Sequence, residues 1–259
     1  MFEIYKFNQA EILTFILVML RISVFLVSWP VFSSGNVPAP VKVLLGLVLS
    51  IVMFPAIGHE RLSAAELERF YIWLMMREAF IGLALGFLAR FFFFAISICA
   101  QIASDSIGLS SVQLLNPTTN DRSSAIEEFY TILGTLFFLG LNGHHIFISG
   151  LAKSYEILPV SLNALNMAAL GSAGALAQSV TVMGLKLSAP VLVSIFCMNL
   201  AMGIIGRAVP QINVLVTSMP INILVGFFVL IISIPLLLTG MGELLNQTIA
   251  GVFGVLKGF

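Results

Sequence analysis

Long apolar runs, separated by short clusters of polar residues, Gly and Pro, dominate the pattern along the chain. The first run, Ile12 to Phe32, is as long as the roughly 20 residues that a helix needs to cross a bilayer. The pattern predicts further helices over 41–53, 70–103, 126–141, 180–205 and 214–238, and a less hydrophobic helix over 240–259. A chain of this length allows about five to seven long helices. We therefore expect an all-α protein of multiple helices.

Gly, Pro and Asn mark where these helices are expected to end. The first helix should close at Trp29-Pro30, and the second should stop at Pro55. Ser63 to Glu66 has the spacing of a capping box, which predicts that the third helix begins there. Asn142-Gly143 predicts a tight turn after the fourth helix. Because several of these breaks fall inside or between apolar runs, we expect kinked hairpins.

The segment from Ser104 to Arg122 is polar, contains Gly108 and includes Asn116-Pro117. A connection of this length between hydrophobic helices is uncommon, and such connections are either functional or disordered. The sequence alone leaves both alternatives open.

Composition narrows the class of protein. The 259 residues are 59% hydrophobic and 9% charged, and 12 basic residues balance 12 acidic ones. Soluble domains carry about 25% charged residues. An ordinary soluble enzyme, a nucleic-acid binder and a disordered regulator are therefore excluded, and the chain is expected to be an integral membrane protein. Glu3 and Glu11 flank Lys6, which argues against a cleavable signal at this end.

Six ionisable residues lie within or at the edges of apolar runs: Arg21, Arg77, Glu78, Arg90, Lys186 and Arg207. A charge at mid-bilayer costs about 2.5–3.5 kcal/mol on insertion scales, so these side chains should face protein or water. One interpretation is a proton or ion pathway. The other, which we favour because most of the six are basic, is that ion pairs hold neighbouring helices or subunits together. Glu78, next to Arg77, is the residue most worth testing.

Residue patterns that carry enzymatic chemistry are missing from the sequence. It contains no nucleophile elbow, phosphate-binding loop, dinucleotide fingerprint or zinc-protease motif. His144 and His145 are adjacent, about 100° apart on a helix, and no acid or Cys follows either at the spacing of a shared metal site. We expect no metal, no cofactor and no enzymatic activity. Gly82 and Gly86 form a GxxxG pattern, which permits close packing of helices in lipid.

Short stretches along nearly the whole chain, in a fixed order, carry a family resemblance. They are Arg21, Pro30, Gly35, Pro38, Val41-Lys42 and Pro55; Arg77-Glu78, Gly82 and Gly86; Gln101, Gly108 and Asn116-Pro117; Asn142-Gly143-His144, Ser154 and Pro159; Lys186 and Pro190; and Arg207, Pro210, Gln211, Asn213, Pro220 and Gly226. In this order the set resembles the FliR family of flagellar export-gate membrane proteins, whose relatives in virulence type III secretion are the SctT proteins.

The resemblance implies a fold and a role. It implies one FliR-type domain over 1–259, in which 1–180 is similar to FliP and 181–259 to FliQ. The expected role is a non-enzymatic subunit that forms, with FliP and FliQ homologues, the closed entrance pore of the flagellar export gate. Unfolded flagellar proteins would be its substrates, FlhA-like and FlhB-like components further partners, and the bacterial inner membrane at the flagellar basal body its location. No nucleic acid is expected as a partner.

The resemblance also implies roles for particular residues. A plug that closes the pore would map to about 108–120, with these residues at its centre: Gly108, Leu109, Ser110, Ser111, Val112, Gln113, Leu114, Leu115, Asn116 and Pro117. Buried charges that support assembly would be Arg77, Glu78, Arg90, Lys186 and Arg207. Further family-motif residues are Pro38, Asn142, Gly143, His144, Pro210, Gln211 and Asn213. The alternatives are a stand-alone secondary transporter, a multi-pass lipid-modifying enzyme, and the SctT subunit of a virulence system.

Overall fold

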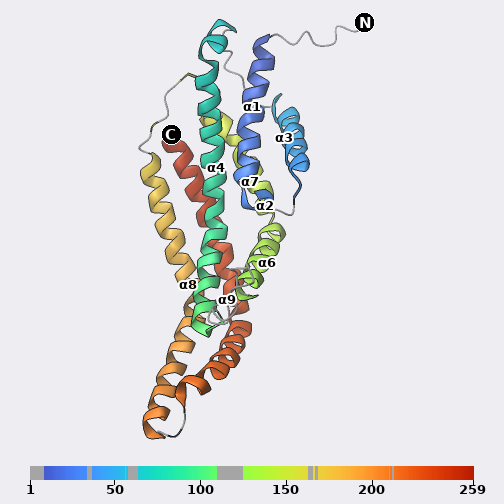
Figure 1. Cartoon of the computed structure of the whole chain (residues 1–259). Coiled ribbons are helices and arrows are strands. Elements are labelled where there is room, and N and C mark those ends of the chain that lie inside the picture. Colours follow the sequence, from blue (N-terminus) through green and yellow to red (C-terminus); the bar gives the residue numbers. More distant parts are fainter. Residues whose placement is uncertain are drawn as a thin grey trace. The chain divides into compact units, whose positions relative to one another are not determined.

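A computed structural model describes residues 9–33, 37–55, 57, 64–109, 125–162, 166, 169–209, 211 and 213–259. Its helices are α1 (Gln9–Ser28), α2 (Pro30–Ser33), α3 (Ala39–Met53), α4 (Ala64–Ile107), α6 (Ala125–Gly140), α7 (Gly143–Ile157), α8 (Ala169–Ala208) and α9 (Val214–Gly258) (Figure 1). No strand occurs among these residues. The prediction of an all-α, multi-helix membrane protein is confirmed.

The chain folds into two compact units that interleave along the sequence. Unit 1 comprises Met1–Phe91, Asn142–Leu176 and Thr248–Phe259, and unit 2 comprises Phe92–Leu141 and Ala177–Gln247. Helices α4, α8 and α9 therefore contribute to both units. The predicted FliP-like part (1–180) and FliQ-like part (181–259) were defined by sequence resemblance and not by compact packing. This division stays a prediction.

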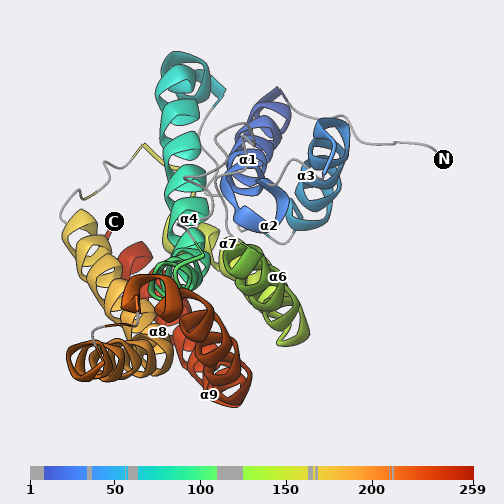
Figure 2. The same cartoon turned by 60° about the horizontal axis from the view of Figure 1, so that its bottom comes forward.

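Unit 1 is built around α1. Figures 1 and 2 both show α3 alongside this helix, and Gly46 of α3 lies against Ser23. On another face of α1, the backbone of α4 comes so close that a Cβ at Gly82 would lie 2.5 Å from the Arg21 carbonyl oxygen. A Cβ at Gly86 would overlap the Ser28 side chain. The close packing predicted from the GxxxG pattern is thus present between α1 and α4, where the missing side chains let the helices meet.

In unit 2, glycines likewise let helices pack closely. Gly134 of α6 packs on Ile96 of α4, and Gly240 of α9 packs on Leu187 of α8. The Phe138 ring of α6 lies 5.5 Å from that of Phe92 on α4, measured between centroids. Aromatic pairs at this separation attract each other beyond their contact area. Glycine contacts and aromatic rings therefore hold the helices of unit 2.

Four described helical segments are long and apolar enough to cross a membrane: Gln9–Ser28, Glu66–Ile107, Gly171–Ala208 and Val216–Gly258. Helices α6 and α7 together pass the same test but bend by 65° at their junction, and would make a fifth span. Helix α3, with 15 residues, is too short. Among the described residues the number of possible spans is therefore four, or five if the bent pair counts as one span.

Several predicted helix boundaries are wrong, and α8 begins at Ala169 rather than at 180. The polar residues Ser104 to Ser106, expected to open the loop, belong to α4, and the Ser106 hydroxyl donates to the Ile102 carbonyl oxygen at 2.6 Å. The runs 214–238 and 240–259 form one helix, α9, which continues through Pro220 and Pro235. The Ser233 hydroxyl, two residues before Pro235, donates to the Leu230 carbonyl oxygen at 2.9 Å.

Candidate functional site

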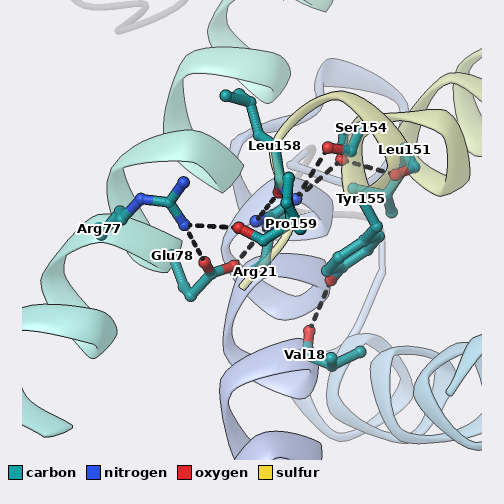
Figure 3. Close-up of polar contacts among 9 residues, drawn as sticks. All are labelled: Val18, Arg21, Arg77, Glu78, Leu151, Ser154, Tyr155, Leu158 and Pro159. Carbon is teal, nitrogen blue, oxygen red and sulfur yellow. Dashed lines mark hydrogen bonds and ion pairs between the residues drawn. The ribbon is translucent and has the colours of Figure 1, made fainter. Parts of the chain in front are cut away.

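A buried ionic cluster in unit 1 joins α1 to α4. Glu78 of α4 is fully buried, and its Oε2 atom accepts a hydrogen bond from Arg21 Nε of α1 at 2.6 Å (Figure 3). Its Oε1 atom accepts from an Nη atom of Arg77 at 3.1 Å. One carboxylate therefore pairs with two guanidinium groups, in a site where all three side chains are 5% exposed or less.

The end of α7 supplies the remaining acceptors. Arg21 donates to the Leu158 carbonyl oxygen at 2.9 Å and to the Ser154 hydroxyl at 3.2 Å, and Arg77 donates to the Pro159 carbonyl oxygen at 2.9 Å. The C-terminus of a helix carries partial negative charge. Because the cluster holds two positive groups and one negative group, these carbonyl groups offset the excess charge.

Tyr155 of α7 closes the site on another side. The Arg21 guanidinium carbon lies 4.0 Å from the centre of the Tyr155 ring, a cation–π contact. The Tyr155 hydroxyl donates to the Val18 carbonyl oxygen of α1 at 3.1 Å (Figure 3). The cluster thus ties α1, α4 and α7 together through polar contacts that lipid cannot replace.

The described contacts of the cluster are ion pairs and hydrogen bonds between helices. An Arg side chain stays protonated, so it does not relay protons, and the cluster contains a single carboxylate. Among the residues that the structure describes, no group of three or more His, Cys, Asp or Glu is placed to hold a metal ion. The arrangement therefore fixes helix positions.

The other three predicted charges lie elsewhere. Arg90, Lys186 and Arg207 are exposed in this chain, and their burial in an assembly stays a prediction. Arg90 Nε donates to the Ser28 carbonyl oxygen at 2.6 Å, next to the end of α1. Lys186 and Arg207 form no ion pair within the described ranges. Lys186 and Arg207 lie on helix faces that the described residues leave exposed.

The predicted plug begins at a well-defined helix end. Gly108 has φ +91°, and its N–H and that of Leu109 both bond the Ser104 carbonyl oxygen, at 3.1 and 3.2 Å. The Gly108 N–H also reaches the Asp105 carbonyl oxygen at 3.2 Å, which completes a Schellman cap. The remaining plug residues lie outside the described residues: Ser110, Ser111, Val112, Gln113, Leu114, Leu115, Asn116 and Pro117.

Most of the described family-motif residues stand where helices begin. Pro38 precedes α3. Asn142 precedes α7 with φ 55° and ψ 28°, which is the tight turn that the sequence predicts. Gly143 is buried at the start of α7, and the ring centroids of His144 and His145 lie 4.1 Å apart. Gln211 lies in the α8–α9 connection, Asn213 Oδ1 accepts from the Val216 N–H at 3.4 Å, and Pro210 lies outside the described residues.

Sequence reasoning omitted two members of the cluster from the assembly set. Arg21 stood out as a charge in an apolar run but received no partner, because its acid lies 57 positions away. Tyr155 received no role. An aromatic residue after Ser154 is an ordinary feature of an apolar helix, and its contact with Arg21 requires that α1 and α7 be adjacent. No local signal in the sequence would have revealed it.

Comparisons with known proteins agree with the resemblance. Residues 12–248 match the family described as bacterial export proteins, family 1. The chain is 32% identical to the flagellar biosynthetic protein FliR of Bacillus subtilis over 238 residues, 91% of each chain. It is 28% identical to FliR of Escherichia coli, over 85% of this chain and 83% of that protein. It is 27% identical to FliR of Aquifex aeolicus, over 91% of each. Since the family match spans nearly the whole chain, this protein belongs to the FliR family of bacterial export proteins.

Proposed function

We propose that this chain is a non-enzymatic core subunit of the flagellar type III export gate in the bacterial inner membrane. With FliP and FliQ homologues it forms the closed entrance pore through which unfolded flagellar proteins leave the cytoplasm, next to FlhA-like and FlhB-like components. The observation that carries the proposal is the similarity to flagellar biosynthetic proteins named FliR over about nine-tenths of both chains. The all-helical fold with four or five possible spans supports a membrane location.

The ionic cluster supports a scaffolding role. It fixes the end of α7 against α1 and α4 through the Glu78 carboxylate, the Ser154 hydroxyl of α7, and the carbonyl oxygens of Leu158 and Pro159, the two residues after α7. A subunit that must keep its shape while an unfolded chain passes beside it needs such fixed points. Arg90, Lys186 and Arg207, exposed in this chain, serve in the proposal as contacts to neighbouring subunits.

The plug hypothesis assigns the resting seal to 108–117. The Schellman cap at Gly108 supports it, because it starts the segment at a fixed position beyond α4. Deleting Ser110 to Leu115 should open the resting gate to ions and small molecules. Deleting Gly58 to Arg61 in the α3–α4 connection is the matched control. An unchanged membrane permeability of the assembled complex with the first deletion refutes the plug.

Assembly is tested by co-expression. A tagged chain produced together with FliP and FliQ homologues should purify as one complex, and it should restore swimming to a flagellated strain lacking its own FliR. A stand-alone secondary transporter would instead drive ion-coupled flux in liposomes that contain this chain alone. That flux, without any complex, would overturn the proposal. Restored secretion in a virulence system, with no effect on swimming, would favour the SctT alternative.

Glu78→Ala separates scaffolding from ion coupling. Because Glu78 pairs with two buried arginines, its loss should lower the yield of the complex more than it alters the ion dependence of export. A normal yield of complex combined with lost export would reverse that ranking and assign Glu78 to coupling.

A further inference from the structure

The exposed residues of α7 are all polar. They are His145, Ser149, Lys153 and Glu156, and every other residue of this helix is buried or partly buried. At about 100° per residue these four positions fall within an arc of roughly 80°, so they form one continuous stripe along the helix. We call these four residues the α7 stripe.

The part of α9 that packs beside α7 also exposes no large apolar side chain. Lys153 Nζ lies 5.7 Å from the centre of the Phe253 ring of α9, and both residues belong to unit 1. The exposed residues of α9 within this unit are small or charged: Ala250, Gly254 and Lys257. This side of unit 1 therefore offers little apolar surface to lipid.

The other long helices of unit 1 have the opposite surface. Between Ile12 and Val27 on α1, and between Val43 and Val52 on α3, every exposed residue is apolar. On α4, Leu83 is 53% exposed. Such surfaces fit lipid or an apolar partner helix, whereas the α7 stripe fits neither.

The α7 stripe lies at the height of a membrane span. Helix α7 runs antiparallel to α1, since the Phe147 ring lies 5.9 Å from that of Trp29 and the Tyr155 hydroxyl bonds to Val18. Helix α1 is itself long and apolar enough to cross a membrane. A charged side chain beside such a span, as on Lys153, should face protein or water rather than lipid.

The charges of the α7 stripe favour water. Lys153 and Glu156 form no ion pair with any residue that the structure describes. A partner helix that covered the stripe would need an acid and a base at matching heights, whereas water satisfies both charges without a matching sequence. One basic and one acidic residue also balance each other. A surface with little net charge and no large apolar side chain binds a passing chain weakly, which transit through a pore requires.

We infer that the α7 stripe lines the water-filled passage of the gate and contacts the unfolded polypeptide in transit. An unfolded chain presents apolar, acidic and basic side chains in succession, and a hydrated stripe of balanced charge lets each of them pass. The inference rests on the proposed function, because it assigns the exported chain to one surface of this subunit.

Cysteine labelling in the assembled complex tests the exposure of the stripe. In a chain with Cys197→Ser, the remaining native cysteine, Cys99, is buried. Ser149→Cys in this background is the test variant, and Val48→Cys on α3 is the matched control, since Val48 is 48% exposed in the chain alone. The complex with FliP and FliQ homologues is placed in nanodiscs, which open both membrane faces to a charged thiosulfonate reagent. Position 149 should react roughly tenfold faster than position 48, because hydrocarbon excludes charge.

A stalled substrate tests the passage. An exported protein fused to a tightly folded domain is co-expressed, and its co-purification shows which share of the complexes holds it. The labelled fraction at position 149 should fall in proportion to that share. Benzoylphenylalanine in place of Ser149 should crosslink to the stalled chain on irradiation, and benzoylphenylalanine in place of Val48 should not.

Each outcome decides the inference. Ala152→Cys, which leaves the four stripe residues in place, repeats the measurement if Ser149→Cys does not assemble. Labelling at 149 as slow as at 48 means that a partner helix covers the stripe, and rapid labelling that a stalled chain neither slows nor crosslinks places it outside the passage. Both results overturn the inference and leave the proposed function standing. If the unmodified chain forms no complex, or the complex holds no exported protein, the proposed function fails and the inference fails with it.

Discussion

Replacing Glu78 by Ala should destabilise the isolated chain severely. The substitution leaves the Arg21 and Arg77 guanidinium groups in a buried site without their shared carboxylate, which they now contact at 2.6 and 3.1 Å. Removing one partner of a buried ion pair costs about 3–5 kcal/mol. Each hydrogen bond to a charged group contributes about 1.5–3 kcal/mol, and Glu78 accepts two, so the estimates agree. Because a domain is stable by only about 5–15 kcal/mol, this loss is a large fraction of the total.

Equilibrium unfolding of the purified chain in detergent micelles, followed by helical circular dichroism, measures the effect. Glu243→Ala is the matched control, because Glu243 is an exposed acid on α9 with no ion pair among the described residues. The control should unfold like the unmodified chain. If Glu78→Ala loses no more stability than Glu243→Ala, the cluster does not hold α1, α4 and α7 together.

A double variant tests whether Arg21 and Glu78 are coupled. Arg21→Met together with Glu78→Leu replaces the ion pair by apolar side chains of similar size, a change that is often close to neutral at buried sites. Arg77 keeps its bond to the Pro159 carbonyl oxygen at 2.9 Å. The double variant should therefore be more stable than Glu78→Ala alone. If the double variant loses as much as the sum of its two single variants, Arg21 and Glu78 are not coupled.

Three further substitutions test the packing around the cluster and the start of the plug. Gly86→Ala places a methyl group on the Ser28 side chain, and this overpacking should lower the free energy of unfolding by about 1–3 kcal/mol. Gly171→Ala, in open space on α8, is the control and should stabilise the chain slightly. The same unfolding assay compares the two variants. Tyr155→Phe removes one hydrogen bond to Val18 but keeps the ring under Arg21. The free energy of unfolding should therefore fall by about 0.5–1.5 kcal/mol. A loss as large as that of Glu78→Ala contradicts the assigned geometry. Gly108→Ala strains a residue at φ +91° by about 1–2 kcal/mol and should increase amide hydrogen exchange in the last turn of α4; unchanged exchange there means that the cap is not as described.

Helix positions were predictable where an apolar run is bounded by strong breakers. The run 41–53 became α3, Ala39–Met53, and the run 126–141 became α6, Ala125–Gly140. The end of α4 was not predictable from polarity, because Ser104 to Ser106 stay helical and the left-handed φ of Gly108 ends the helix. Polarity is therefore a weaker stop signal than a glycine that can adopt positive φ.

The candidate site was only partly predictable for a different reason. A charge within an apolar run indicates that some neighbour must satisfy it, but the sequence does not state which helix face is covered. Arg77 and Glu78 lie between Leu74 and Ile81, both buried, on the face of α4 that meets α1. Lys186 follows Leu185, which is 47% exposed, on a face that the described part of this chain leaves open. A charge within an apolar run thus belongs to a buried cluster in one place and is exposed in the other.

Polar side chains within the apolar helices fall into two classes here, and the classes predict opposite responses. The charges of the Arg21, Arg77 and Glu78 cluster are paired within unit 1, although Arg77 Nε has no hydrogen-bond partner among the described residues, so disruption of the cluster should weaken the isolated chain. The Asn199–Asn222 pair in unit 2 forms one neutral hydrogen bond, and the buried Asn222 Oδ1 has no partner among the described residues, so replacing both by Leu should leave the isolated chain in micelles as stable as before, or more stable. A loss of stability in the double variant as large as that of Glu78→Ala would mean that the pair holds α8 to α9 together, and would place it in the first class.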